Sequence, residues 1–109
     1  MICNLTPHTV TIVDEGGNVL AEFASSGVAR ATQTDVPATP VEGIPCVVST
    51  FGPPTGLPDP IEGVYLIVSA ITASAARASG RTTEDLLLTS GPVRNAEGAI
   101  IGCRAFARV

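Results

Sequence analysis

The residues best suited to chemistry lie where a run of β-forming residues changes into an alanine-rich segment. Residues 64–68 favour a buried strand, and the alanine-rich residues from Ser69 onward favour a helix that Gly80 ends. Ser69 or Thr72 is suited to cap the first turn of that helix. Because the first N–H groups of a helix have no intrahelical partner and lie at the positive end of its dipole, this junction is the best candidate anion site.

Further polar and aromatic side chains could complete a binding site around this junction. Asn4, Thr6 and the single histidine, His8, alternate along an extended segment, so they share one side and can all form hydrogen bonds. Arginine offers a planar fork for carboxylate or phosphate, and an aromatic ring could cover a nucleobase. The sequence therefore adds three arginines and two aromatic residues as candidates: Arg30, Arg94, Arg104, Tyr65 and Phe51.

Each candidate also has a purely structural interpretation. The hydroxyl of Ser69 could serve only as a helix cap, the arginines as solvated surface charges, and the two aromatic residues as core. Asn4, Thr6 and His8 could equally satisfy backbone groups in a turn. Only the meeting of these side chains in one place would distinguish a binding site from these alternatives.

A catalytic role has weaker support. Ser69 and His8 could form a hydrolase pair with one of three carboxylates, but Ser69 lacks the flanking glycines of a nucleophile elbow. A lone histidine without paired carboxylates offers little for acid–base work, and no metal-ligand spacing or glycine-rich phosphate loop is present. We therefore expect a non-catalytic protein without a cofactor or a metal. The carboxylates considered for the hydrolase alternative are Asp35, Asp59 and Asp85.

Composition narrows the class of protein. The 109 residues predict one domain (residues 1–109), and 45% hydrophobic residues suffice for an aliphatic core. The net charge is −4 and all six basic residues are arginine, which argues against binding to nucleic acid. The three cysteines fit neither a disulfide framework nor a zinc site and predict buried thiols in a reducing cytoplasm. No apolar run is long enough to predict a membrane span or a signal peptide.

The spacing of apolar residues and the positions of turn residues predict an α+β fold. This fold is a small and mostly antiparallel sheet of about six short strands with one helix packed on it. Residues 9–23 and 93–109 each alternate around a turn and predict β-hairpins. Residues 32–43 contain two prolines and favour an ordered loop or a poor edge strand. The remaining predictions are strands at 28–31 and 44–50, an irregular proline-rich loop at 51–60 that walls a pocket or spans the core, and a buried segment at 86–88.

The order of several landmarks resembles a group of short, uncharacterised proteins met in bacteria, prophages and phage genomes. The most specific landmarks are the Asn-Leu-Thr-Pro-His opening at residues 4–8 and the Tyr-Leu-Ile-Val-Ser junction at residues 65–69. The others are Gly27–Arg30, Gly43–Pro45, Phe51–Gly52, Gly56–Pro58, Val93–Asn95 and Gly98–Arg104. The resemblance covers nearly the whole chain and implies a phage-linked setting.

Small proteins of that setting include counter-defence proteins that capture nucleotide immune signals. By this analogy of context, we expect a homo-oligomer in the host cytoplasm that sequesters a small anionic ligand, such as a cyclic nucleotide. The alternatives are a protein-interaction module, whose apolar surface would contact another protein, and the Ser69–His8 hydrolase. A ligand binder should gather its polar groups in a concave site, whereas an interaction module should expose an apolar patch.

Overall fold

Two β-hairpins with alternating apolar residues form most of the body of the protein. In the computed structural model, which describes residues 1–109, β2 (Val10–Val13) pairs with β3 (Val19–Phe23), and β7 (Leu86–Arg94) pairs with β8 (Ile100–Arg108). Both hairpins predicted from the sequence are confirmed. The buried segment at 86–88 is the beginning of β7 and not a separate element.

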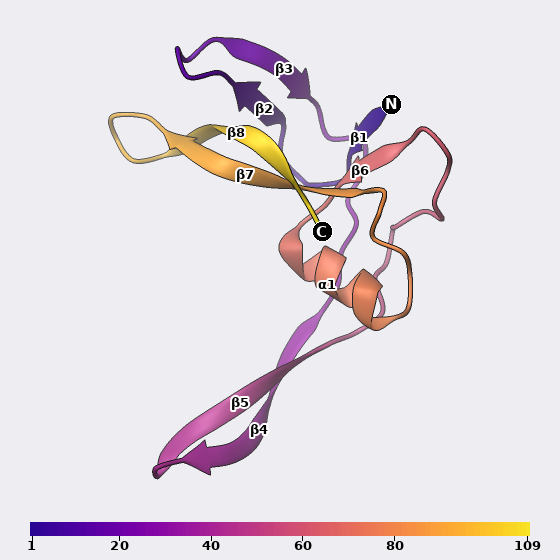
Figure 1. The fold of residues 1–109 in the computed structure, drawn as a ribbon, viewed down its shortest axis with the longest axis vertical. Helices are drawn as coiled ribbons and strands as arrows, with labels where there is room; N and C mark the ends of the chain where they lie inside the picture. Colours follow the sequence, from indigo (N-terminus) through magenta and orange to yellow (C-terminus); the bar gives the residue numbers. More distant parts are fainter.

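These hairpins join β1 (Ile2–Asn4) and β6 (Tyr65–Ile67) in one six-stranded sheet of order β1-β6-β7-β8-β2-β3 (Figure 1). The sheet is mixed, because β6 runs parallel to both β1 and β7, and β2 runs parallel to β8. The antiparallel ladders are the longer ones, so most paired residues are antiparallel. The predicted class, a β-rich α+β fold with one helix on a sheet of six strands, is confirmed.

The sheet curls until its two edges nearly meet. Asn4 at the end of β1 bridges to Ser25, just beyond β3, and the N–H of Ser26 donates to the carbonyl oxygen of Asn4 at 2.8 Å. The interior is aliphatic, apart from the rings of Phe23 and Phe106, whose centroids lie 5.9 Å apart. Its buried residues are Val10, Ile12, Ile67, Leu87 and Cys103. The result is a small, nearly closed barrel.

The helix α1 (Ala70–Ala78) covers the outer face of this sheet. Leu66 pairs with Leu86 and both pack under the helix, whereas their neighbours Ile67 and Leu87 point into the barrel. Strands that are buried on both faces carry continuous apolar runs. This explains why polar and apolar residues do not alternate in β6 and at the start of β7. With nine residues, the only helix in the structure falls far short of the length needed to cross a membrane.

The remaining two strands, β4 (Gln33–Val41) and β5 (Ile44–Phe51), form a separate hairpin that projects from the body (Figure 1). Of the two predictions for residues 32–43, the edge strand is confirmed. Pro37 and Pro40 fit there because each strand of a two-stranded ribbon has a free edge. At the tip, both Glu42 and Gly43 have positive φ, 50° and 79°, which suits a two-residue hairpin turn.

The two segments that flank the projecting hairpin, residues 28–31 and the proline-rich segment, are mostly irregular. The strand predicted at residues 28–31 is wrong, because this segment contributes only an isolated bridge between Arg30 and Thr55. Of the proline-rich residues 51–60 that were predicted to be irregular, Phe51 is the last residue of β5 and the rest contain no helix or strand. The two segments pack against each other beside α1 and form the root of the projecting hairpin.

Candidate functional site

A depression of about 510 Å³ lies at the N-terminus of α1. Its walls come from the loop after β1, from residues 28–32 and from the proline-rich segment, which contributes Pro53 and Thr55. Four of the residues predicted for ligand binding line this one depression: Thr6, Arg30, Ser69 and Thr72. The sequence could not show that these four meet, because they come from three segments far apart in the chain.

The floor of the depression is the first turn of the helix. Of the two predicted N-cap candidates, Ser69 is the N-cap residue, and its Oγ accepts a hydrogen bond from the N–H of Thr72 at 3.2 Å. Its own hydroxyl proton goes to Oγ1 of Thr72, 3.0 Å away. The helix leaves the N–H groups of Ala70 and Ile71 without intrahelical partners, so the partial positive charge of the helix is available at this end.

Thr72 has a supporting role beneath the site. Its side chain is fully buried, and its hydroxyl donates to the carbonyl oxygen of Ala29 at 3.3 Å. This bond fixes the segment that carries Arg30 against the first turn of α1. Thr72 therefore positions its neighbours, while its own hydroxyl is occupied.

Arg30 is the exposed cation of the depression. Its guanidinium forms no hydrogen bond or ion pair within the chain. Each of the other five arginines in the sequence bonds at least one oxygen: Arg77 to Thr83, Arg81 to Asp85, Arg94 to Gly98, Arg104 to Asp14 and Arg108 to Glu84. The backbone of Arg30 is nevertheless held in place by the bridge to Thr55. A fixed backbone with an unbonded guanidinium suits the recognition of an external anion.

Asn4 lies below the depression and not on its surface. It is 1% exposed, and its amide nitrogen donates to the carbonyl oxygens of His8 and Phe23 at 2.7 and 2.8 Å. Its Oδ1 accepts bonds from both the N–H and the hydroxyl of Thr6, at 2.9 and 2.6 Å. Asn4 thus orients Thr6 and closes the barrel, while a ligand in the depression would contact only Thr6.

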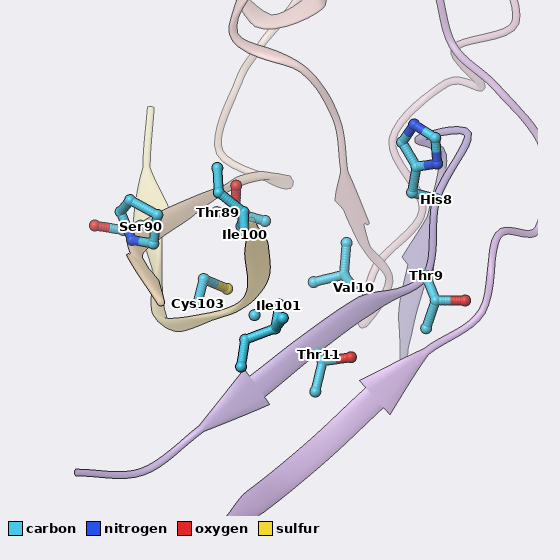
Figure 2. A pocket seen from close by; sticks show the side chains of 11 residues that line it. His8, Thr9, Val10, Thr11, Thr89, Ser90, Ile100, Ile101 and Cys103 are labelled. Atoms are coloured by element: carbon cyan, nitrogen blue, oxygen red, sulfur yellow. The ribbon is translucent and has the colours of Figure 1, made fainter. Parts of the chain in front are cut away.

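His8 belongs to a second depression of about 520 Å³ between β2 and the β7–β8 hairpin (Figure 2). It is exposed, whereas Val10 and Cys103, which line the same depression, are buried. Ser69 and His8 therefore line different depressions, and the Ser69 hydroxyl contacts no base. The hydrolase alternative lacks its central pair.

The four other predicted residues lie away from the depression beside α1. Arg94 and Arg104 bind carbonyl oxygens in the two hairpin turns, at 2.8 and 2.6 Å. Tyr65 lies under the guanidinium of Arg108, which is 5.5 Å from the ring centroid. Phe51 ends β5 and is half-buried. The lining residues that were not among the predicted ligand-binding residues include Thr32, Pro53 and Thr55, although the proline-rich loop was one predicted pocket wall.

The structure offers no metal or disulfide chemistry. The three cysteines are free, with Cys103 buried and the other two half-buried. No group of three or more histidine, cysteine, aspartate or glutamate side chains could hold a metal ion. Comparison with family models, with curated proteins and with solved structures returns no match, so the interpretation of the site rests on its own geometry.

Proposed function

We propose that this protein binds and sequesters a small anionic ligand in the depression at the N-terminus of α1. The observation that carries the proposal is that Arg30, the one arginine whose guanidinium is unbonded, lines the same depression as Ser69 and the first turn of the helix. A guanidinium fork and helical N–H groups both favour phosphate or carboxylate oxygens.

The composition of the walls favours a ligand with an apolar part as well as a charge. Leu5, Pro7 and Ile71 also line the depression, and none of its lining residues is acidic. A nucleotide combines a phosphate with a flat base and suits such a wall. Together with the resemblance to phage-linked proteins, this makes a nucleotide-derived immune signal, captured in the host cytoplasm, the ligand class that we propose.

The proposed role is capture without turnover. No histidine, aspartate or glutamate lines this depression, so no side chain there could act as a general base toward a bound ester. Ser69 is engaged with Thr72 through both its donor and one acceptor site. A ligand bound here should therefore leave the site chemically unchanged.

Isothermal titration against cyclic and linear nucleotides, followed by chromatography of the recovered ligand, tests this function. We expect one or more nucleotides to bind and to be recovered intact. Arg30→Gln should weaken binding roughly 10- to 100-fold, because it removes a charge-assisted hydrogen bond. Arg94→Gln is the matched control and should leave affinity unchanged, since Arg94 is occupied in a turn. The absence of heat from every nucleotide, or recovery of an altered ligand, would contradict the proposal.

A second candidate function, a protein-interaction module, is favoured by the projecting β4–β5 hairpin. Valine and isoleucine side chains along this hairpin are 39–64% exposed. We propose that the protein self-associates, and pull-down from host lysate tests for a different protein partner. The two functions are compatible, because the hairpin and the depression are different surfaces.

A further inference from the structure

The β4–β5 hairpin, residues 33–51 and called the arm below, has one face without any charge. In an antiparallel ladder, directly paired residues share a face. Three consecutive pairs on one side of the arm are Thr34 with Thr50, Val36 with Val48, and Ala38 with Cys46. We call these six residues the uncharged face. The opposite face carries Asp35, which accepts a hydrogen bond from Ser49 at 2.8 Å.

The arm lacks the support that a two-stranded ribbon needs, because such a ribbon is at best marginally stable in water on its own. Val36 and Val48 are nevertheless 39% and 53% exposed. The projection also makes the chain unusually extended. Its radius of gyration is 16.4 Å, whereas a compact chain of this length would have about 13 Å. Both features are expected of an arm that is buried by a partner.

A second surface of the same chain matches the uncharged face in chemistry. The depression between β2 and the β7–β8 hairpin, called the groove below, contains no acidic residue, lysine or arginine, and its one titratable side chain with a basic nitrogen is His8. Ile100 and Ile101 at this groove are 60% and 54% exposed, and threonine side chains accompany them. Strands β2 and β8 are paired at a single position, Ile12 with Cys103, so these two strands are barely paired beside the groove. The arm projects away from β2, β7 and β8, the strands that line the groove (Figure 1).

The lack of charged side chains on both surfaces allows a second copy of this acidic chain to occupy them. The chain carries a net charge of −4, so two copies repel each other over most of their surface. The uncharged face and the groove are the places where this repulsion is weakest and where aliphatic side chains can be buried. Both surfaces combine exposed aliphatic residues with threonine hydroxyls, so neither would bury an unpaired charge against the other.

The area of the contact indicates a reciprocal arrangement. A two-stranded ribbon of eight residues measures about 26 by 10 Å, so one face covers roughly 250 Å². A single arm in a single groove then buries about 500 Å² in total, well below the roughly 1,000 Å² expected of a stable interface. Two exchanged arms reach about that value. A two-fold dimer allows this exchange, because each copy presents the same two surfaces.

We propose that the protein forms a two-fold dimer in which the uncharged face of each arm packs into the groove of the other copy. This proposal rests on the self-association proposed above and names its surfaces, but it does not depend on the ligand. The root of the arm includes Thr32 and Pro53, which also line the ligand depression. The residues that flank the arm thus contribute to the wall of the binding site, while the arm itself does not line it.

The first test is the solution mass, measured by light scattering after size exclusion. The wild-type protein should have twice the mass of the chain. Val48→Glu places a charge on the uncharged face, and Ile101→Glu places one in the groove. Each should weaken dimerisation by roughly 100-fold or more, because a carboxylate would be buried without a partner. A monomeric wild-type protein would overturn the proposal.

The chain offers a matched control for each variant. Val47→Glu changes the next residue of β5, which lies on the opposite face and is 61% exposed. Leu20→Glu changes a residue of β3 that is 64% exposed and lies outside the groove. Both controls should remain dimeric. A dimer that persists in Val48→Glu or Ile101→Glu, or that is lost in either control, would contradict these contacts.

Mixing the two monomeric variants separates a lost contact from a lost fold. The Ile101→Glu variant keeps its arm and the Val48→Glu variant keeps its groove, so the mixture retains one of the two contacts. Because one contact buries only about 500 Å², we expect the mixture to associate far more weakly than the wild type but measurably more than either variant alone at high protein concentration. Equal association of the mixture and of the single variants would contradict the reciprocal arrangement. Titration of both variants with the nucleotide panel keeps the two proposals distinct, since a monomer that binds nucleotide supports the ligand site alone.

Discussion

Arg30 and Thr55 exchange both of their backbone hydrogen bonds, with N···O distances of 2.9 and 2.7 Å. The hydroxyl of Thr55 donates a further bond to the carbonyl oxygen of Arg30, at 3.4 Å. This bridge joins the two segments that enter and leave the arm. It therefore fixes the root of the arm and the backbone of the one arginine with an unbonded guanidinium at the same point.

Gly56, next to this bridge, should tolerate no side chain. Its φ is +74°, and an added Cβ would lie 2.6 Å from the carbonyl oxygen of Val28. We expect Gly56→Ala to lower the free energy of unfolding by about 3 kcal/mol, because a left-handed conformation and a backbone clash both oppose alanine. Gly63→Ala is the control, since Gly63 has a similar φ of +78° but open space around it. That variant should cost only about 1 kcal/mol. Urea unfolding measures both, and equal losses would contradict the clash.

Asn4→Ala should be among the most destabilising single substitutions. Asn4 is 1% exposed, and its amide closes the barrel through the carbonyl oxygens of His8 and Phe23. Truncation removes the amide donor from both carbonyl oxygens, of which that of His8 still accepts from the Thr6 hydroxyl, and it leaves the N–H of Thr6 without its acceptor. We expect a cost of about 3 kcal/mol. Thr6→Val keeps the Asn4 amide bonds and should cost about 1 kcal/mol. Thermal unfolding of both variants checks the order, and a smaller effect of Asn4→Ala would contradict this role.

Arg81 and Asp85 form a two-pronged ion pair that anchors the proline-rich loop. The two N···O distances are both 2.9 Å, the side chains are 13% and 10% exposed, and Arg81 also donates to the carbonyl oxygen of Pro58 at 2.7 Å. Asp85→Asn removes the countercharge and should cost about 3 kcal/mol. It should also speed proteolysis within residues 52–64. Arg77→Gln, which loses only an exposed contact of 3.5 Å with Thr83, should change neither quantity.

Asp14 should contribute to the loss of stability in acid. Its pKa is lowered from the ordinary value of 3.8, first by the N–H of Asn18 and then by the side-chain amide of that residue, with smaller contributions from Gly16 and Arg104. A carboxylate with a depressed folded pKa stabilises the fold above its unfolded pKa, and this contribution is lost as pH falls through the folded pKa.

The corresponding experiment compares melting temperatures between pH 2 and pH 7. Asp14→Asn should be less stable than the wild type at neutral pH, and the difference should shrink below pH 3.8, the ordinary pKa. Asp59→Asn is the control, because the exposed Asp59 carboxylate accepts no hydrogen bond in the structure. A difference between Asp14→Asn and the wild type that stays constant with pH would contradict the assignment.

The sequence by itself determined the local elements of this protein. Alternation around a turn predicted both hairpins, and Ser69 and Gly80 predicted the two ends of the helix. These features depend on residues within a few positions of one another, through side-chain period, capping and positive φ. The apolar runs at residues 64–68 and 86–88 predicted burial for the same reason, and Leu66, Ile67, Val68, Leu86 and Leu87 are buried.

Only the tertiary structure decided which candidate residues meet. Parallel pairing of β1 with β6 places Asn4 opposite Ile67, and the N–H of Leu5 donates to the carbonyl oxygen of Ile67 at 2.9 Å. Thr6 and Ser69 consequently reach the same depression, while His8 lies beyond the turn beside β2. Arg94 and Arg104 looked equivalent to Arg30 in the sequence. In the structure their guanidinium groups bind carbonyl oxygens, whereas that of Arg30 is unbonded. Pairing between distant strands sets these positions, and no local pattern encodes that pairing.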